Sequence, residues 1–202
     1  MTKYTPQSQN LELLKTYQHL LETWQPKINL ISSSTLPNAW DRHFVDSLQL
    51  LSYLPQEKLS LIDLGSGAGF PGLVLAIERP ETLEVTLVES DLRKCLFLET
   101  VSRETKIKVT VLRSRIESLF DESKKDVITA RGLASLSLLL EYVFPFMKEN
   151  SMALFLKGKE VEKEIQEAQK KWDFSLEIFP SLTDPRGRIL KVKQLKRIFS
   201  ND

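Results

Sequence analysis

The stretch 61–72, Leu-Ile-Asp-Leu-Gly-Ser-Gly-Ala-Gly-Phe-Pro-Gly, constrains the fold of this chain more than any other part of its sequence. An apolar run leads into a turn that contains Gly65, Gly67 and Gly69, and Pro71 follows. Short apolar runs before glycines indicate buried strands, and proline favours the first turn of a helix. Glycine permits positive φ and lets a ligand approach the bare backbone. We therefore predict a strand, a turn and a helix around a ligand crevice.

Strand and helix patterns alternate after this turn as well as around it. Strands are predicted at 59–64, 85–88, 109–112, 127–129, 152–156, 176–179 and 189–195, and helices at 73–77, 92–101, 136–146 and 161–171. Such alternation predicts an α/β fold with a mostly parallel sheet and helices on both faces. A turn signal at 184–187 predicts that the last strand is antiparallel.

The N-terminal part has helical rather than alternating character. One helix is predicted to start at a cap formed by Asn10 and to extend to about Ile28. A second is predicted to start at Pro37 and to stop before Pro55. We expect residues 1–56 to form an N-terminal helical cap and residues 57–202 to form one compact domain.

Two carboxylates decide which ligand suits the glycine turn. Gly67, Gly69 and Gly72 also fit the dinucleotide fingerprint, which alone is a weak signal and leaves a nicotinamide oxidoreductase as an alternative. Asp63, in the first strand, would repel a pyrophosphate but suits the ammonium and sulfonium groups of S-adenosylmethionine. Glu89, at the end of the next strand, can accept hydrogen bonds from both ribose hydroxyls. The pattern favours S-adenosylmethionine as the cofactor and hence a methyltransferase.

Composition limits the compartment, the metal content and the partners that we expect for this chain. The 202 residues include one cysteine and two histidines, which argues for a metal-free cytosolic protein. The first six residues lack the apolar core of a signal peptide, and no apolar run is long enough to span a membrane. With 28 basic and 27 acidic residues, a nucleic-acid partner would need a local basic face. Arginine and lysine residues gather at 186–197, and we expect a monomer.

The methyl acceptor is constrained by what the sequence lacks. Cys95 lies among apolar residues of a predicted helix, so it is interpreted as a core thiol rather than the nucleophile that pyrimidine C5 needs. The segment 126–132 lacks the Asn/Asp-Pro-Pro-aromatic turn that is typical of exocyclic amine methylation. A ring nitrogen such as guanine N7 needs no base, because its lone pair is free. The sequence is consistent with that acceptor.

Several polar residues are predicted near the crevice. Arg131 is expected to bind phosphate or a guanine edge, while Lys157 could contact RNA or simply be solvated. His43 and Asp46 share one helix face, either as a stabilising pair or with a catalytic role for His43. The segment 114–117 could close over an adenine ring, form a capping box, or do both.

The chain resembles the bacterial ribosomal small-subunit RNA guanine-N7 methyltransferases, also called glucose-inhibited division protein B, from about residue 11 to residue 193. The Phe-Pro-Gly continuation of the glycine turn and the Arg-His-x-x-Asp-Ser segment are its most specific motifs. The matching segments are Ile28-Asn29-Leu30-Ile31-Ser32, Arg42-His43-Phe44-Val45-Asp46-Ser47, 63–72, Ser114-Arg115-Ile116-Glu117, Ala130-Arg131-Gly132-Leu133-Ala134, Leu156-Lys157-Gly158 and Gly187-Arg188.

The resemblance implies a Rossmann-like methyltransferase fold and methyl transfer to N7 of a guanine in the decoding region of small-subunit ribosomal RNA. The partner would be this RNA or a ribosomal subunit. The expected cofactor contacts are Asp63, Gly65, Gly67, Gly69, Phe70, Glu89, Ile116, Glu117 and Arg131. The expected RNA contacts are Arg115, Arg131, Lys157 and Arg188, with Arg131 and His43 as positioning residues in catalysis. A non-catalytic RNA-binding module with the same fold is the alternative.

Overall fold

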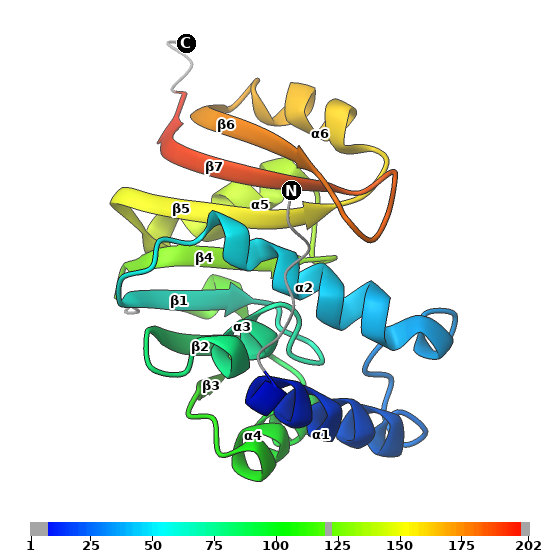
Figure 1. The fold of residues 1–202 in the computed structure, drawn as a ribbon. Coiled ribbons are helices and arrows are strands. Elements are labelled where there is room, and N and C mark those ends of the chain that lie inside the picture. Colours follow the sequence, from blue (N-terminus) through cyan, green and yellow to red (C-terminus); the bar gives the residue numbers. More distant parts are fainter. Residues whose placement is uncertain (1–7, 120–122, 199–202) are drawn as a thin grey trace.

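The computed structural model of the protein describes residues 8–119 and 123–198. Within them, one seven-stranded sheet has the strand order β3-β2-β1-β4-β5-β7-β6 (Figure 1). The strands are β1 Leu59–Leu64, β2 Leu83–Glu89, β3 Thr110–Arg113, β4 Lys125–Arg131, β5 Met147–Lys157, β6 Trp172–Pro180 and β7 Arg188–Arg197. β1 to β5 pair in parallel, whereas β7 is antiparallel to both of its neighbours. The prediction of a mostly parallel, Rossmann-like sheet with an antiparallel last strand is confirmed.

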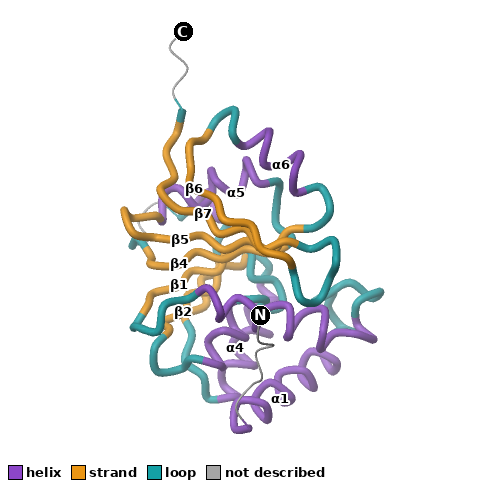
Figure 2. Tube along the Cα trace, turned by 45° about the horizontal axis from the view of Figure 1, so that its top comes forward, coloured by secondary structure: helices purple, strands orange, loops and turns teal. Residues whose placement is uncertain are grey.

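Helices cover both faces of the sheet (Figure 2). One face packs against α5 Leu136–Val143 and α6 Val161–Ala168, through a core that includes Phe155 and Leu190. The other packs against α1 Ser8–Trp24, α3 Gly72–Glu78, α4 Leu92–Thr105 and the helical segment 36–53. No helix within the described ranges is long and apolar enough to cross a membrane.

The segment 36–53 differs from the single regular helix that the sequence predicts. It consists of a 3₁₀ turn at Leu36–Asn38, a π-helix at Trp40–Val45, the short α2 at Asp46–Leu48 and a 3₁₀ turn at Gln49–Tyr53. Wide π turns recur at functional sites, where they redirect side chains. Here Phe44 is fully buried against Tyr17 while His43 and Asp46 face a cavity.

The first helix braces the glycine turn. Tyr17 is fully buried in α1, its hydroxyl donates to the Ala68 carbonyl, and its ring stacks on Phe70 at 5.3 Å. The prediction that Asn10 caps this helix is wrong, because α1 begins at Ser8 and the Asn10 amide instead donates to the Glu78 carbonyl at 3.4 Å. The first six residues lie outside the described ranges. The division into residues 1–56 and 57–202 stays a prediction.

Candidate functional site

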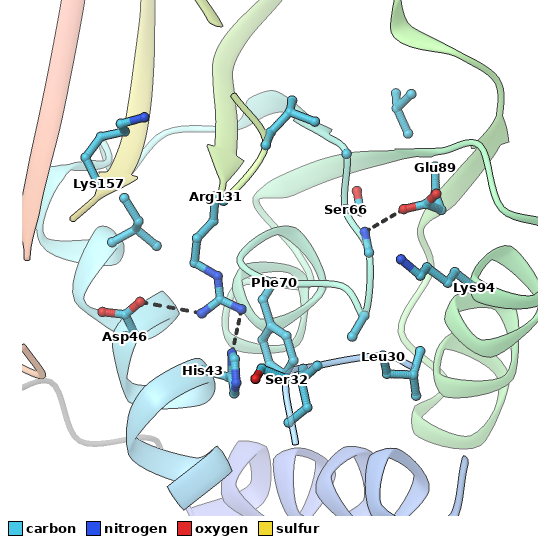
Figure 3. A pocket seen from close by; sticks show the side chains of 18 of the residues that line it. Leu30, Ser32, His43, Asp46, Ser66, Phe70, Glu89, Lys94, Arg131 and Lys157 are labelled. Carbon is cyan, nitrogen blue, oxygen red and sulfur yellow. Dashed lines mark hydrogen bonds and ion pairs between the residues drawn. The ribbon is translucent and has the colours of Figure 1, made fainter. Parts of the chain in front are cut away.

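A cavity of about 740 Å³ opens at the carboxyl ends of β1, β2, β4 and β5 (Figure 3). Its walls come from the glycine turn after β1, the end of β2, the segment after β3, the end of β4, the helical segment 36–53 and the β6–β7 turn. Ligands bind at this edge of open parallel sheets. Parallel strand order therefore gathers, in one place, residues that lie more than a hundred positions apart in the sequence.

The glycines of the turn face different surroundings: two line the cavity and one packs against α1. Gly65 and Gly67 line the cavity with φ of +65° and +58°. A Cβ at Gly67 would have the Gly65 carbonyl oxygen, 3.9 Å away, as its nearest contact, so this backbone is open to a ligand. Gly69 does not line the cavity, and a Cβ there would lie 2.5 Å from the Tyr17 hydroxyl. The expected cofactor contact of Gly69 is corrected: its missing side chain makes room for Tyr17.

Asp63 also lies outside the cavity. Its carboxylate is fully buried between β1 and α3, where Thr129 Oγ1 donates at 2.6 Å and the Gly72 amide donates at 3.3 Å. Burial raises its pKa from 3.8 to about 6, against the lowering effect of the hydrogen bond from Thr129. The expectation that Asp63 meets the ammonium of the cofactor is therefore corrected, because the carboxylate is used to hold the start of α3 against β1.

Glu89 ends β2 at the cavity wall and fixes the turn opposite it. Its Oε2 accepts from the Gly67 amide at 2.9 Å, and its Oε1 accepts from the amides of Ser90 at 2.7 Å and Asp91 at 2.9 Å. The side chain is 9% exposed, at the cavity surface. One carboxylate thus ties two loops together at the place where the sequence predicts the ribose.

The segment after β3 borders the same end of the cavity. Arg115, Ile116 and Glu117 line it, as expected from the sequence. The predicted capping box is wrong: Ser114 Oγ donates to the Arg115 carbonyl at 3.0 Å, and Glu117 accepts from the Tyr142 hydroxyl at 2.8 Å. A 3₁₀ turn, Ile116–Ser118, forms instead of an α-helix. The apolar side chain of Ile116 and the exposed Arg115 are thereby presented at the rim.

Arg131 lies on the side of the cavity away from Glu89 (Figure 3). Its Nη2 lies 2.7 Å from His43 Nδ1, and its Nη1 donates to the Arg42 carbonyl at 3.1 Å and to Asp46 Oδ2 at 3.5 Å. The guanidinium lies 5.0 Å from the centre of the Phe70 ring. The side chain is 18% exposed, so this arginine is a fixed part of the wall.

His43 is held neutral by this arrangement. An arginine only donates, so His43 Nδ1 accepts from Arg131 and Nε2 carries the proton toward Thr35 Oγ1 at 2.9 Å. Burial, followed by the charges of Arg131 and Arg42, lowers the pKa of His43 from 6.5 to about 3. Both ring nitrogens are engaged, which suits a positioning residue for Arg131.

Lys157 and Arg188 meet across the sheet, because their strands pair them directly. Lys157 is 10% exposed, and its ammonium donates to the Ala134 carbonyl at 2.8 Å and pairs with Glu164 Oε2 at 2.6 Å. Arg188 is half-buried, and its Nη1 donates to the carbonyls of Pro185 and Gly187 at 3.0 Å and 2.8 Å. Both side chains line the cavity, but the ammonium of Lys157 is already paired.

Three charged residues of the cavity wall were not predicted as site residues. Lys94 lines the cofactor end beside Glu89, while Arg42 and Asp184 form an ion pair of 3.0 Å across the other end. Lys94 carried a signal, since a cation in the first turn of a helix opposes the helix dipole. Cys95, one residue later, lies in the core and not at the cavity, as the sequence predicts.

Solved structures share this fold at low sequence identity. The ribosomal protein L11 methylase of Lactobacillus delbrueckii matches this chain with a TM-score of 0.61 and 15% identity. The match covers 78% of this chain and 79% of the methylase. A 16S rRNA N2 G1207 methyltransferase of T. thermophilus, in complex with AdoMet and guanosine, matches 73% of the chain with a TM-score of 0.55 and 20% identity; the chain covers 42% of that protein. These similarities establish the fold alone.

Sequence relatives are much closer. The family model described as rRNA small subunit methyltransferase G (GidB) matches residues 10–189. The ribosomal RNA small subunit methyltransferase G of Paramagnetospirillum magneticum is 45% identical over 98% of this chain and 95% of its own length. The protein of the same name from Rickettsia prowazekii is 40% identical over 95% of this chain and 98% of its own length. The chain therefore belongs to the family of rRNA small subunit methyltransferase G.

Proposed function

We propose that this protein transfers the methyl group of S-adenosylmethionine to N7 of a guanine in the decoding region of small-subunit ribosomal RNA. The observation that carries the proposal is a single cavity with two chemically different halves. Gly65, Gly67 and Glu89 border one half, and Arg131 and Asp46 border the other. A nucleoside cofactor and a flipped-out base need two such adjoining halves. The family to which the chain belongs supplies the reaction class and the RNA substrate.

The first half fits the cofactor. The backbone at Gly67 is bare toward the cavity. Glu89 Oε1 already accepts from two amides, but Oε2 accepts from the Gly67 amide alone among the described residues and has a further position for a ribose hydroxyl. Ile116 provides apolar contact for an adenine ring, and Glu117 an acceptor close to it. When bound, S-adenosylmethionine supplies an electrophilic methyl carbon on a sulfonium. Gly65 and Phe70 also line the cavity.

The second half positions the acceptor. Guanine N7 carries a free lone pair in the neutral base, so the protein does not need to remove a proton before transfer. Catalysis then depends on alignment of the reacting atoms. Arg131 is fixed by His43, Asp46 and the Phe70 ring, so it can contact the target nucleotide without reorganising. His43 acts as a positioning residue for that guanidinium.

The RNA side lies around the mouth of the cavity. Arg115, which is exposed, and Arg188, at the start of β7, line the cavity and can contact phosphates of the RNA. Arg131 contacts the nucleotide from inside, and Lys157 supports that wall through its pair with Glu164. Residues 1–56 act as a helical cap that completes the base half, and residues 57–202 act as the methyltransferase domain. The protein works in the cytoplasm, as a monomer, on this RNA or on a ribosomal subunit.

The test is a methylation reaction with labelled S-adenosylmethionine. Naked small-subunit RNA, assembling subunits and mature subunits are offered separately, and the modified base is mapped. Label at N7 of one guanine in the decoding region is the expected result. RNA binding without label transfer would mean a non-catalytic RNA-binding module, and label at a pyrimidine or an exocyclic amine would contradict the acceptor.

A further inference from the structure

We propose that Asp46 selects guanine by accepting hydrogen bonds from its N1–H and 2-amino groups. This inference rests on the proposed function, because it assigns the base selectivity of that reaction to one side chain. Asp46 lies at the start of α2, on the opposite side of Arg131 from Ser66 and Glu89 (Figure 3). Its side chain lines the cavity and is 16% exposed.

The two oxygens of the Asp46 carboxylate have different surroundings. Oδ1 accepts from Thr183 Oγ1 at 2.6 Å and from Gln49 Nε2 at 2.8 Å, which fixes the plane of the group. Oδ2 makes, among the described residues, one long contact, 3.5 Å to Arg131 Nη1. An ionised carboxylate oxygen can accept two hydrogen bonds, and the contact of 3.5 Å is too long to fill either position, so Oδ2 can accept from both N1–H and the 2-amino group. Oδ2 is therefore a preorganised acceptor at the cavity wall.

The shape of guanine matches this position. N7 lies on one edge of the purine, and N1–H and the 2-amino group lie on the opposite edge. Asp46 lies across Arg131 from Ser66 and Glu89 (Figure 3), so a guanine with N7 directed at the cofactor half would direct its opposite edge toward Asp46. Adenine presents a lone pair at N1 and a C–H at C2, so the carboxylate would repel it. The side chain of Asp46 thus distinguishes the two purines without touching the reacting atom.

The charge that develops during transfer favours the same residue. The N7 lone pair forms the new bond to the methyl carbon while the sulfur–carbon bond breaks and its electron pair stays on sulfur. No proton is lost, so the positive charge passes from the sulfonium to the guanine ring. A carboxylate at the far edge of that ring stabilises the charge as it forms. Asp46 therefore favours both the correct base and its methylated form.

The other carboxylates of the cavity are less suited. Glu89 is occupied by three backbone amides at the cofactor half, and Glu117 is bound to Tyr142 near the segment after β3. Asp184 is nearer to the base half, where Oδ2 accepts from Arg42 at 3.0 Å and Oδ1 accepts from the Arg186 amide at 2.9 Å. Asp184 is accordingly the matched competitor in the test.

The experiment compares kcat/KM on small subunits that carry guanine or inosine at the mapped target position. Inosine keeps N1–H and N7 but lacks the 2-amino group. A hydrogen bond to a charged group predicts roughly a tenfold or greater preference of the wild type for guanine. Asp46→Asn should reduce that preference to about twofold, because a carboxamide is a weaker acceptor. A rise in the relative rate on adenine is expected as well, since the Asn amide can donate to adenine N1.

Two variants serve as controls. Thr183→Val removes a donor to Asp46 from outside the cavity, and Asp184→Asn neutralises the competing carboxylate. Asp184→Asn should leave the preference for guanine unchanged. Thr183→Val, which removes one of the bonds that fix the plane of the Asp46 carboxylate, should reduce the preference less than Asp46→Asn does. Equal wild-type rates on guanine and inosine would overturn the inference. A preference for guanine that persists in Asp46→Asn would overturn it too, and its collapse in Asp184→Asn would assign the selection to Asp184. Absence of methylation by the wild type on guanine would instead refute the proposed function.

Discussion

Gly67 lies at positive φ with open space where a side chain would project, which makes it the sharpest single test of the cofactor half. Gly67→Val should weaken binding of S-adenosylmethionine by roughly tenfold or more, because the new side chain fills the ligand's place on the backbone. Gly132→Val is the control for backbone strain, since Gly132 also has positive φ, +62°, and no atom within 4 Å of an added Cβ, and it lines the cavity next to Arg131 rather than at the glycine turn. Calorimetry should show the loss in Gly67→Val alone, although both variants lower the unfolding temperature.

Asp63 predicts a pH dependence of stability. Its pKa is about 6 in the folded protein and 3.8 as the ordinary value, so the folded state holds the proton more tightly. The stabilisation from this protonation is complete below pH 3.8 and is lost as pH rises through 6, in total about 3 kcal/mol at 1.36 kcal/mol per pKa unit. Asp63→Asn mimics the protonated form. Urea unfolding from pH 4 to pH 7 should show wild type losing stability relative to Asp63→Asn, and parallel curves would contradict the assignment.

Some residues of the candidate site could be predicted from the sequence, whereas others depend on tertiary contacts. The places of Gly67 and Glu89 at the cavity were predictable, because they follow from the strand, turn and strand that position them, and their contacts with the cofactor stay a prediction. The sequence singles out Asp63 and Gly69 as functional positions, but their structural roles could not be predicted. The side chain of Asp63 is directed at α3 and the missing side chain of Gly69 at Tyr17 in α1, and neither partner is visible from the local pattern.

The connection between β5 and the helices α5 and α6 depends on the pair Lys157–Glu164. Glu164 Oε2 also accepts from the Leu136 amide at 2.7 Å, at the start of α5. Lys157→Met and Glu164→Gln should each destabilise the protein by about 1–3 kcal/mol, and the double variant by less than the sum, as measured by urea unfolding. Additive losses would mean that the pair contributes no coupling. Lys157→Met should leave the salt dependence of RNA binding unchanged if its role is structural.

At the level of elements, the alternation of strand and helix patterns predicted the sheet well. β1 coincides with the predicted run 59–64, because a strand buried on both faces has a mostly apolar sequence, here interrupted only by Ser60 and Asp63. The helical segment 36–53 was predictable as helical but not as a π turn followed by short turns. Trp40, Phe44 and Leu48 have ordinary helical spacing, and the packing of Phe44 against Tyr17 and Phe70 is a tertiary effect.

Seen as a whole, the molecule has a formal net charge of only +1, so attraction of RNA depends on where its cations lie. Arg42, Lys94, Arg115 and Arg188 line the mouth of the cavity. Of these four, Arg42 is paired with Asp184 at 3.0 Å. Lys163 on α6, away from the cavity, is paired with Glu160 at 3.3 Å. The charge balance could not predict this distribution, because it arises when separate loops meet at the carboxyl edge of the sheet.

This distribution predicts which cations RNA affinity depends on. Each phosphate neutralised by an arginine contributes roughly 0.7 to the slope of log affinity against log salt for a single strand. Arg115→Ala and Arg188→Ala should each weaken RNA binding and reduce that slope by about this amount, while affinity for S-adenosylmethionine stays near that of the wild type. Lys163→Ala removes the same charge from an exposed site on α6 and should leave the slope unchanged. If all three variants lower the slope equally, the RNA responds to total charge, and the cavity mouth is not the binding face.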